Sequence, residues 1–216
     1  MGKKNLLLLG GSGLIGSALR KLLNQSTEWN VIAPTRQDLD LREAQAVAKF
    51  FDTLRSEVVI NAAGKSGGVL ANKNYPADFI LENNQIQMNI LHSALRSKVA
   101  KLIQFIPACI YPTTATLPYR EASILTGPLE ESSQYFAIAK INALMMAQAF
   151  NRQHGTQFIS LIPSNVYGPM TKTASENSHV VPSLLHKMKS AKATNTPHVE
   201  VWGNGSNLRD YLHTLD

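Results

Sequence analysis

The chain has 216 residues, of which 44% are hydrophobic and 17% charged, which suits one folded domain with a small appendage and excludes a disordered protein. The formal net charge of +6 comes from scattered lysines and arginines without a basic run, so we expect an anionic small molecule rather than nucleic acid as partner. No stretch approaches the roughly 18 apolar residues of a membrane span, and the single cysteine, Cys109, excludes an internal disulfide and fits a reducing, cytoplasmic compartment.

Short apolar runs alternate with longer amphipathic segments along the chain. In chain order, the pattern predicts a strand at 5–10, a helix at 14–23, a strand at 30–34, a helix at 42–54, a strand at 57–63, a helix at 76–98, a strand at 101–107, a helix at 132–154 and a strand at 157–163. Strands and helices that alternate in this way form βαβ units. We therefore predict an α/β fold, a Rossmann-type doubly wound parallel sheet, whose ligands bind beyond the carboxyl ends of the strands.

The segment GGSGLIG follows the first predicted strand and opens the first predicted helix. Its first glycine permits a tight turn, its third lets a pyrophosphate approach the backbone, and its last lets helix and strand pack closely. Phosphates at a helix N-terminus meet free N–H groups and the positive end of the helix dipole. Glycines also collect in turns for conformational reasons alone, but in this context we predict a dinucleotide site made by Gly10, Gly11, Ser12, Gly13, Leu14, Ile15 and Gly16.

The end of the second predicted strand bears on which dinucleotide binds. An NAD-preferring site places an acidic residue there to hold the ribose 2′-OH. Thr35 and Arg36 occupy that position instead, and an arginine suits a 2′-phosphate, so we favour NADP(H); the alternative is a solvated surface arginine. Asp40 either contacts the adenine or caps the helix that begins near Arg42, and we favour the cap.

Several further segments carry a resemblance to a known family. They read GGSGLIGSALR, NAAGKSGGVLANKNYPADFI, CIYP, AIAKI, FNRQHG, PSNVYGP, NSHVVPSLL and VWGNGSNLRDYLH. In this order they resemble the GDP-fucose synthase family, the NADP-dependent GDP-4-keto-6-deoxymannose epimerase/reductases of the extended short-chain dehydrogenase/reductase superfamily. The resemblance implies an NADP-binding Rossmann domain at 1–170 and a partial substrate-binding lobe at 171–216. It also implies cofactor contacts from Leu41, Ala62, Ala63, Gly64, Lys140, Pro163, Asn165, Val166 and His179.

The chemistry of such a family follows from its substrate. A 4-keto group acidifies the C–H bonds at C3 and C5, so an acid and a base on opposite faces can invert both centres before hydride transfer to C4. The resemblance implies that Cys109 and His179 are the epimerising pair. It implies that Lys140 holds the nicotinamide ribose and, as a cation, lowers the pKa of a neighbouring phenol. We predict no metal site.

The sequence departs from the family at the reduction site. Phe136 stands at the catalytic tyrosine position and Pro107 at the catalytic serine position, so both hydroxyl donors to the C4 oxygen are lost. Tyr135 is one position too early to share a helical face with Lys140. Natural divergence explains Pro107 better than deliberate substitution does. Two hypotheses remain open: an enzyme with altered or residual activity, and an NADP-binding pseudoenzyme with a regulatory or partner-binding role.

The resemblance also bears on substrate and partner. It implies that Lys187, Trp202 and Arg209 contact the GDP-sugar, although the family usually has arginine where this chain has Lys187. The family continues well beyond the residues that match YLHTLD, so we expect a substrate pocket that is open, incomplete or completed by another chain. We also expect a homodimer that forms through the helices near 76–98 and 132–154.

Overall fold

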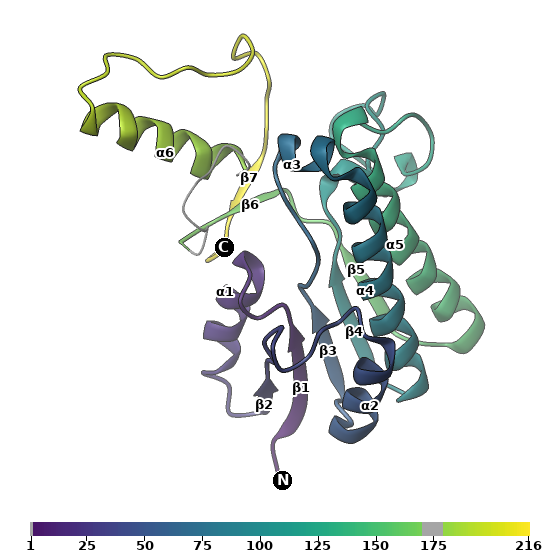
Figure 1. Ribbon diagram of the computed structural model, residues 1–216. Coiled ribbons are helices and arrows are strands. Elements are labelled where there is room, and N and C mark those ends of the chain that lie inside the picture. Colours follow the sequence, from purple (N-terminus) through teal and green to yellow (C-terminus); the bar gives the residue numbers. More distant parts are fainter. Residues whose placement is uncertain (1, 170–178) are drawn as a thin grey trace.

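A computed structural model describes residues 2–169 and 179–216 (Figure 1). Its centre is a sheet of five strands in the order β2-β1-β3-β4-β5, and each neighbouring pair is parallel. The strands are β1 (Lys4–Leu9), β2 (Trp29–Ile32), β3 (Val58–Asn61), β4 (Lys101–Phe105) and β5 (Phe158–Leu161). The order reverses at β1, which places the topological switch point, where ligands of such sheets bind, between β1 and β3. The predicted doubly wound parallel sheet is therefore confirmed.

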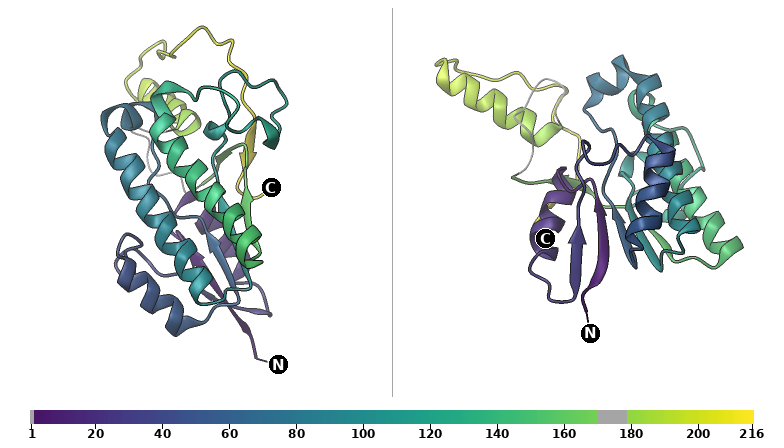
Figure 2. Two further views of the ribbon diagram at one scale, coloured as in Figure 1. Left: turned by 90° about the vertical axis from the view of Figure 1, so that its right-hand side faces the viewer. Right: turned by 60° about the horizontal axis from the view of Figure 1, so that its bottom comes forward.

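Helices cover both faces of the sheet (Figures 1 and 2). On one face lie α2 (Ala44–Leu54), α4 (Pro76–Arg96) and α5 (Gln134–His154), with α4 packed along α5. On the other face, α1 (Leu14–Leu23) packs against β1 and β2. All four helices were expected from the sequence, within about two residues of their observed bounds.

The four leucines of β1 show why this strand lies at the centre. Side chains of a strand alternate between faces, and a parallel strand covered by helices on both faces buries both sets. Leu7 and Leu9 belong to the large core beneath α4 and α5, whereas Leu6 and Leu8 belong to a smaller core beneath α1. The uninterrupted run Leu6–Leu9 is therefore a consequence of burial on both sides.

The structure corrects one local prediction. The helix expected from Arg42 begins at Ala44, and its N-cap is Glu43, which makes no side-chain capping bond. The carboxylate of Asp40 instead accepts the backbone N–H of Arg42, at 3.0 Å, and the guanidinium of the same residue. Asp40 is therefore not the helix cap, because its carboxylate oxygens bind Arg42, before the first residue of α2.

The C-terminal part contains elements that the periodicity did not predict. β6 (Asn165–Tyr167) pairs with β7 (Tyr211–His213) in a separate parallel two-stranded sheet, and α6 (Val180–Ala193) lies beyond the carboxyl ends of the main strands, away from α4 and α5 (Figures 1 and 2). The short helix α3 (Val69–Asn74) precedes α4 and was also missed. In the two described ranges, no helix is long and apolar enough to cross a membrane.

Candidate active site

The glycine turn after β1 forms one wall of the site. Gly10 has a φ of +76°, and a β-carbon there would lie 2.6 Å from the carbonyl carbon of Ala62, in the loop after β3. A β-carbon on Gly16 would overlap the carbonyl of Gly10. Gly13 is the N-cap of α1 and makes no side-chain capping bond, and the first turn of this helix carries no acidic residue. The positive end of the α1 dipole is thus left for an external anion.

Polar side chains of α4 hold the loop after β3. Asn83 accepts the backbone N–H of Lys65, at 3.1 Å, and donates to the carbonyl of the same residue, at 3.0 Å. Gln87 accepts from the side chain of Asn61, at 2.8 Å, and Asn61 accepts the backbone N–H of Ala63. These bonds fix the loop that contains Ala62, Ala63 and Gly64 at the switch point.

Lys140 is a buried cation at this end of the sheet. Its side chain is on α5, the residue is 5% exposed, and a β-carbon on Gly64 would lie 2.9 Å from its Nζ atom. Burial lowers the pKa of Lys140 to about 8, and within the described ranges no carboxylate counters that effect. An ammonium held this way is a candidate to bind a polar ligand group that comes close to Gly64.

Phe136 faces Lys140 where the resemblance placed a phenol. The Lys140 Nζ atom lies 5.8 Å from the centre of the Phe136 ring, and this ring is perpendicular to that of Phe79 on α4, with a centroid distance of 5.9 Å. Tyr135 is 45% exposed and lies outside this cluster. Pro107 caps a 3-10 turn over Ala108–Ile110 directly after β4. In the described ranges, the rings that meet at Lys140 are therefore those of Phe136 and Phe79, and neither carries a hydroxyl.

Cys109 lies in this 3-10 turn and packs against the main core. Burial raises the pKa of its thiol to about 11, although the nearby charge of Lys140 acts in the opposite direction. Ser133 lies beside the thiol and donates its hydroxyl to the carboxylate of Glu130, at 3.0 Å. At neutral pH the thiol is protonated, so it can give a proton but does not readily take one.

The remaining predicted residues lie nearer the C-terminal part. Pro163 precedes β6, and Asn165 donates its backbone N–H and its side-chain amide to the carbonyl of Asp210, while Val166 pairs with Leu212 of β7. His179 is the N-cap of α6; the residue is exposed, yet nearby protein atoms remove enough water to lower the pKa of its imidazole. In the described parts of the chain, no hydrogen bond joins His179 to Cys109.

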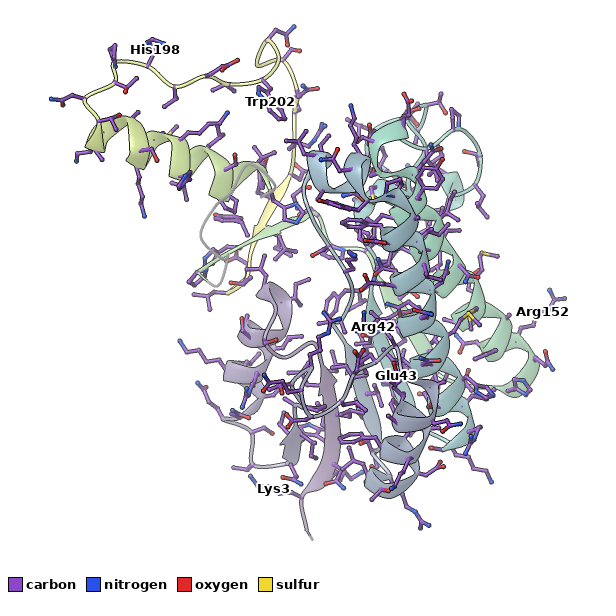
Figure 3. All side chains as sticks on the ribbon, viewed as in Figure 1. Lys3, Arg42, Glu43, Arg152, His198 and Trp202 are labelled. Atoms are coloured by element: carbon purple, nitrogen blue, oxygen red, sulfur yellow. The ribbon has the colours of Figure 1, made fainter. Side chains whose placement is uncertain are left out.

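Two of the three predicted substrate residues contact each other. Lys187 lies 5.5 Å from the centre of the Trp202 ring and donates to the carbonyl of Glu200, at 2.9 Å. Trp202 lies on the extended segment beyond the main strands (Figure 3). Arg209 donates to the carbonyl of Leu208 and is exposed. The structure thus brings Lys187 and Trp202 together but not Arg209.

Comparison with known proteins decides the family. The model of the NAD dependent epimerase/dehydratase family matches residues 6–216. The chain belongs to this family.

Relatives within the epimerase/dehydratase family are close. GDP-L-fucose synthase of Escherichia coli (strain K12) is 41% identical over 216 residues, which are 100% of this chain and 67% of that protein. Putative GDP-L-fucose synthase 2 of Arabidopsis thaliana is 44% identical over 211 residues, 98% of this chain and 64% of that protein. The structure of a GDP-L-fucose synthetase from Naegleria fowleri bound to NADP has a TM-score of 0.87 at 30% identity and covers 99% of this chain and 70% of that one. The resemblance is confirmed, and the chain spans about two thirds of the length of these relatives.

Sequence reasoning missed several site residues of this epimerase/dehydratase. Asn83 and Gln87 are polar, fully buried and four residues apart, which is a readable signal in a helix whose other buried positions are mostly apolar. No sequence pattern marked Ser133 or Arg42 as a site residue, because the contact of Ser133 with Cys109 and that of Arg42 with Asp40 form only when the loops fold. In the two described ranges, no group of three or more histidine, cysteine, aspartate or glutamate residues could hold a metal ion.

Proposed function

We propose that this protein binds NADP(H) and a GDP-linked 4-keto-6-deoxy sugar, retains weak proton exchange on that sugar, and reduces it poorly. The observation that carries the proposal is the Phe136 ring against Lys140, since this ring keeps the shape of a tyrosine but has no proton to give. Loss of a positioned proton donor costs about 10²- to 10⁴-fold in rate. Pro107 removes a second donor to the same oxygen, a loss that by itself costs about 10²- to 10³-fold in rate. Because both donors act on one atom, the combined loss in rate is smaller than the product of the two separate losses.

The cofactor part of the proposal rests on the fit of the glycine turn. Gly10 and Gly16 lie in a fold of the backbone that side chains would fill, and α1 presents an uncompensated N-terminus beside them. Arg36 is exposed after β2, where a 2′-phosphate would lie, and Lys140 supplies a buried ammonium. NADPH, when bound, supplies the hydride for C4. The GDP-L-fucose synthetase bound to NADP is a relative of the same fold.

The epimerising step depends on the thiol of Cys109 and the imidazole of His179. The thiol is protonated at neutral pH and is therefore the proton donor of the pair, whereas an exposed imidazole with a lowered pKa is neutral and able to accept a proton. The enolate that forms has lost both hydroxyl donors, so exchange at C3 or C5 is slow.

The second candidate is a binding protein without catalysis. It is favoured by the contacts of Lys187 with Trp202 and with the carbonyl of Glu200. It is also favoured by the lack, within the described ranges, of a hydrogen bond between His179 and Cys109. Such a protein would bind NADP(H) and pair with or regulate an active relative.

Three measurements on the same preparation test these functions. A fluorescence titration reports NADPH binding, NADPH absorbance reports reduction of GDP-4-keto-6-deoxymannose, and deuterium wash-in followed by NMR reports exchange at C3 and C5. We expect binding, slow exchange and no appreciable NADPH oxidation. Fast oxidation contradicts the loss of the proton donor, absence of binding at millimolar NADPH contradicts the cofactor site, and binding without exchange supports the second candidate.

We also propose that the protein is a homodimer through α4 and α5. Leu81 and Met88 on α4, and Ile138 and Met145 on α5, are exposed, and each pair is seven residues apart on one helix face. We expect Met88→Lys or Met145→Lys to halve the mass measured by light scattering. Leu22→Lys is the control, because Leu22 is an exposed apolar residue on α1, on the other face of the sheet, and we expect this variant to remain a dimer. A monomeric parent protein would contradict the proposed dimer.

A further inference from the structure

Asp40 lies between two arginines and is bound to only one of them. Arg42 donates to its carboxylate from Nε, at 3.0 and 3.2 Å, and from a terminal nitrogen, at 2.6 Å. The nearest approach of Arg36 is 3.9 Å, from Nε. The fork of Arg42 is thus bidentate on the carboxylate, whereas Arg36 makes a loose contact.

Arg42 is itself fixed to the rest of the fold. Glu82 of α4 lies 3.7 Å from its guanidinium, and Asn89 of α4 donates to the backbone carbonyls of Leu41 and Arg42, at 2.9 and 3.0 Å. Figure 3 shows Arg42 and Glu43 on the side of the sheet that α2 and α4 cover. The side chain of Arg42 is 34% exposed and that of Arg36 is 69% exposed. One arginine is therefore part of the framework and the other is free to meet a ligand.

The negative charge of Asp40 explains why the different roles of Arg42 and Arg36 matter for binding a phosphate. Arg42 holds the pKa of Asp40 at about 2, so the carboxylate is ionised at neutral pH. Without the Arg42 side chain, this carboxylate would keep the backbone N–H of residue 42, at 3.0 Å, but Arg36, at 3.9 Å, would be the nearest cation on its own loop. It would then attract Arg36 and repel any phosphate that Arg36 binds.

We propose that Arg42 is a specificity-determining residue that keeps Arg36 available for the 2′-phosphate of NADP(H) by binding Asp40. Arg42 acts through Asp40 and does not touch the cofactor, so it is a positioning residue. The inference rests on the proposed function, because it deepens the cofactor site described there. It predicts that the preference for a phosphorylated ribose depends on the Asp40–Arg42 pair as well as on Arg36.

The experiment uses NADPH, NADH and two smaller probes, adenosine 2′,5′-bisphosphate and adenosine 5′-monophosphate, titrated by calorimetry. We expect Arg42→Gln to weaken NADPH and the bisphosphate by about tenfold, the worth of one charged hydrogen bond, and to leave NADH and the monophosphate within about twofold. The control is Arg96→Gln, which removes the same charge at the far end of α4, where Arg96 pairs with Asp52 at 2.9 Å. We expect it to change none of the four affinities.

A double variant separates electrostatics from a loosened loop. Asp40→Asn in the Arg42→Gln background removes the charge that competes for Arg36, so we expect NADPH affinity to return to within about twofold of the parent. A double variant that stays weak would overturn the inference, because the loss would then come from loop structure. Equal losses in Arg42→Gln and Arg96→Gln would overturn it as well. A parent that binds the bisphosphate no better than the monophosphate would overturn both the inference and the proposed NADP(H) site.

Discussion

The ammonium nitrogen of Lys140 lies 5.8 Å from the centre of the Phe136 ring, which comes four residues earlier on the same face of α5. A tyrosine in this place would carry its hydroxyl at the end of a ring that already contacts the lysine. The burial of Lys140, the packing of Phe136 against Phe79 and the exposure of Tyr135 make this one pair the centre of the site.

Phe136→Tyr is expected to restore part of the reduction. The new phenol lies beside a buried cation, which lowers its pKa and makes it a better proton donor. We expect NADPH oxidation with GDP-4-keto-6-deoxymannose to rise by about 10²-fold, and further when Pro107→Ser is added, as measured by absorbance. Tyr135→Phe is the matched control and should have no effect, because its side chain points to solvent. No gain in the double variant would show that substrate does not reach this pair.

Lys140 makes stability depend on pH in a calculable direction. Burial lowers the pKa of Lys140 from 10.5 to about 8. Between these two pH values the unfolded chain binds a proton that the folded chain lacks. The free energy of unfolding therefore increases as the pH rises through this range. The difference corresponds to about 3 kcal/mol. Lys140→Met should therefore be more stable than the parent at pH 7, by up to that amount, and the gain should disappear above pH 10.5. Urea unfolding of both proteins across this range measures it; a constant difference would contradict the buried charge.

Gly10→Ala tests the close approach of the glycine turn to the loop after β3. Gly155, the C-cap of α5, is a matched control, because it also has a positive φ, +67° against +76°, but has no atom near its missing β-carbon. We expect Gly155→Ala to cost about 1 kcal/mol from backbone strain alone. Gly10→Ala should cost about 2 kcal/mol more, because its β-carbon meets the backbone of Ala62. Equal costs in urea unfolding would show that the turn can move away from that loop.

Cys109 is the single cysteine, so its reactivity can be read without ambiguity. With a thiol pKa of about 11 rather than 9.0, the thiolate fraction at neutral pH falls by about 10²-fold, and alkylation should slow in proportion. We expect slow labelling by iodoacetamide, followed by mass spectrometry, with a steep rise above pH 9. Rapid labelling at pH 7 would mean that the thiol is ionised by its surroundings.

The sequence by itself determined the sheet and its ligand edge. Leu6–Leu9, Leu14–Leu23 and the glycines between them specify strand, turn and helix through local hydrophobicity and backbone freedom, which need no knowledge of distant residues. The same holds for the i, i+4 relation of Phe136 and Lys140, which the pitch of one helix fixes. The resemblance then supplied roles for these positions.

Only the tertiary structure decided which charges and hydroxyls meet. Asp40 was expected to cap a helix, but it binds Arg42, because that guanidinium reaches it first while Asn89 of α4 holds the Arg42 backbone. Cys109 and Ser133, far apart in sequence, are joined where η1, the 3-10 turn at Ala108–Ile110, packs against α5. The contact of Cys109 with Ser133 depends on the distance between two loops, which the packing of the whole sheet sets. Asp40 and Arg42 are only two residues apart, but the backbone of their loop is fixed by Asn89 of a distant helix, which no local pattern reveals.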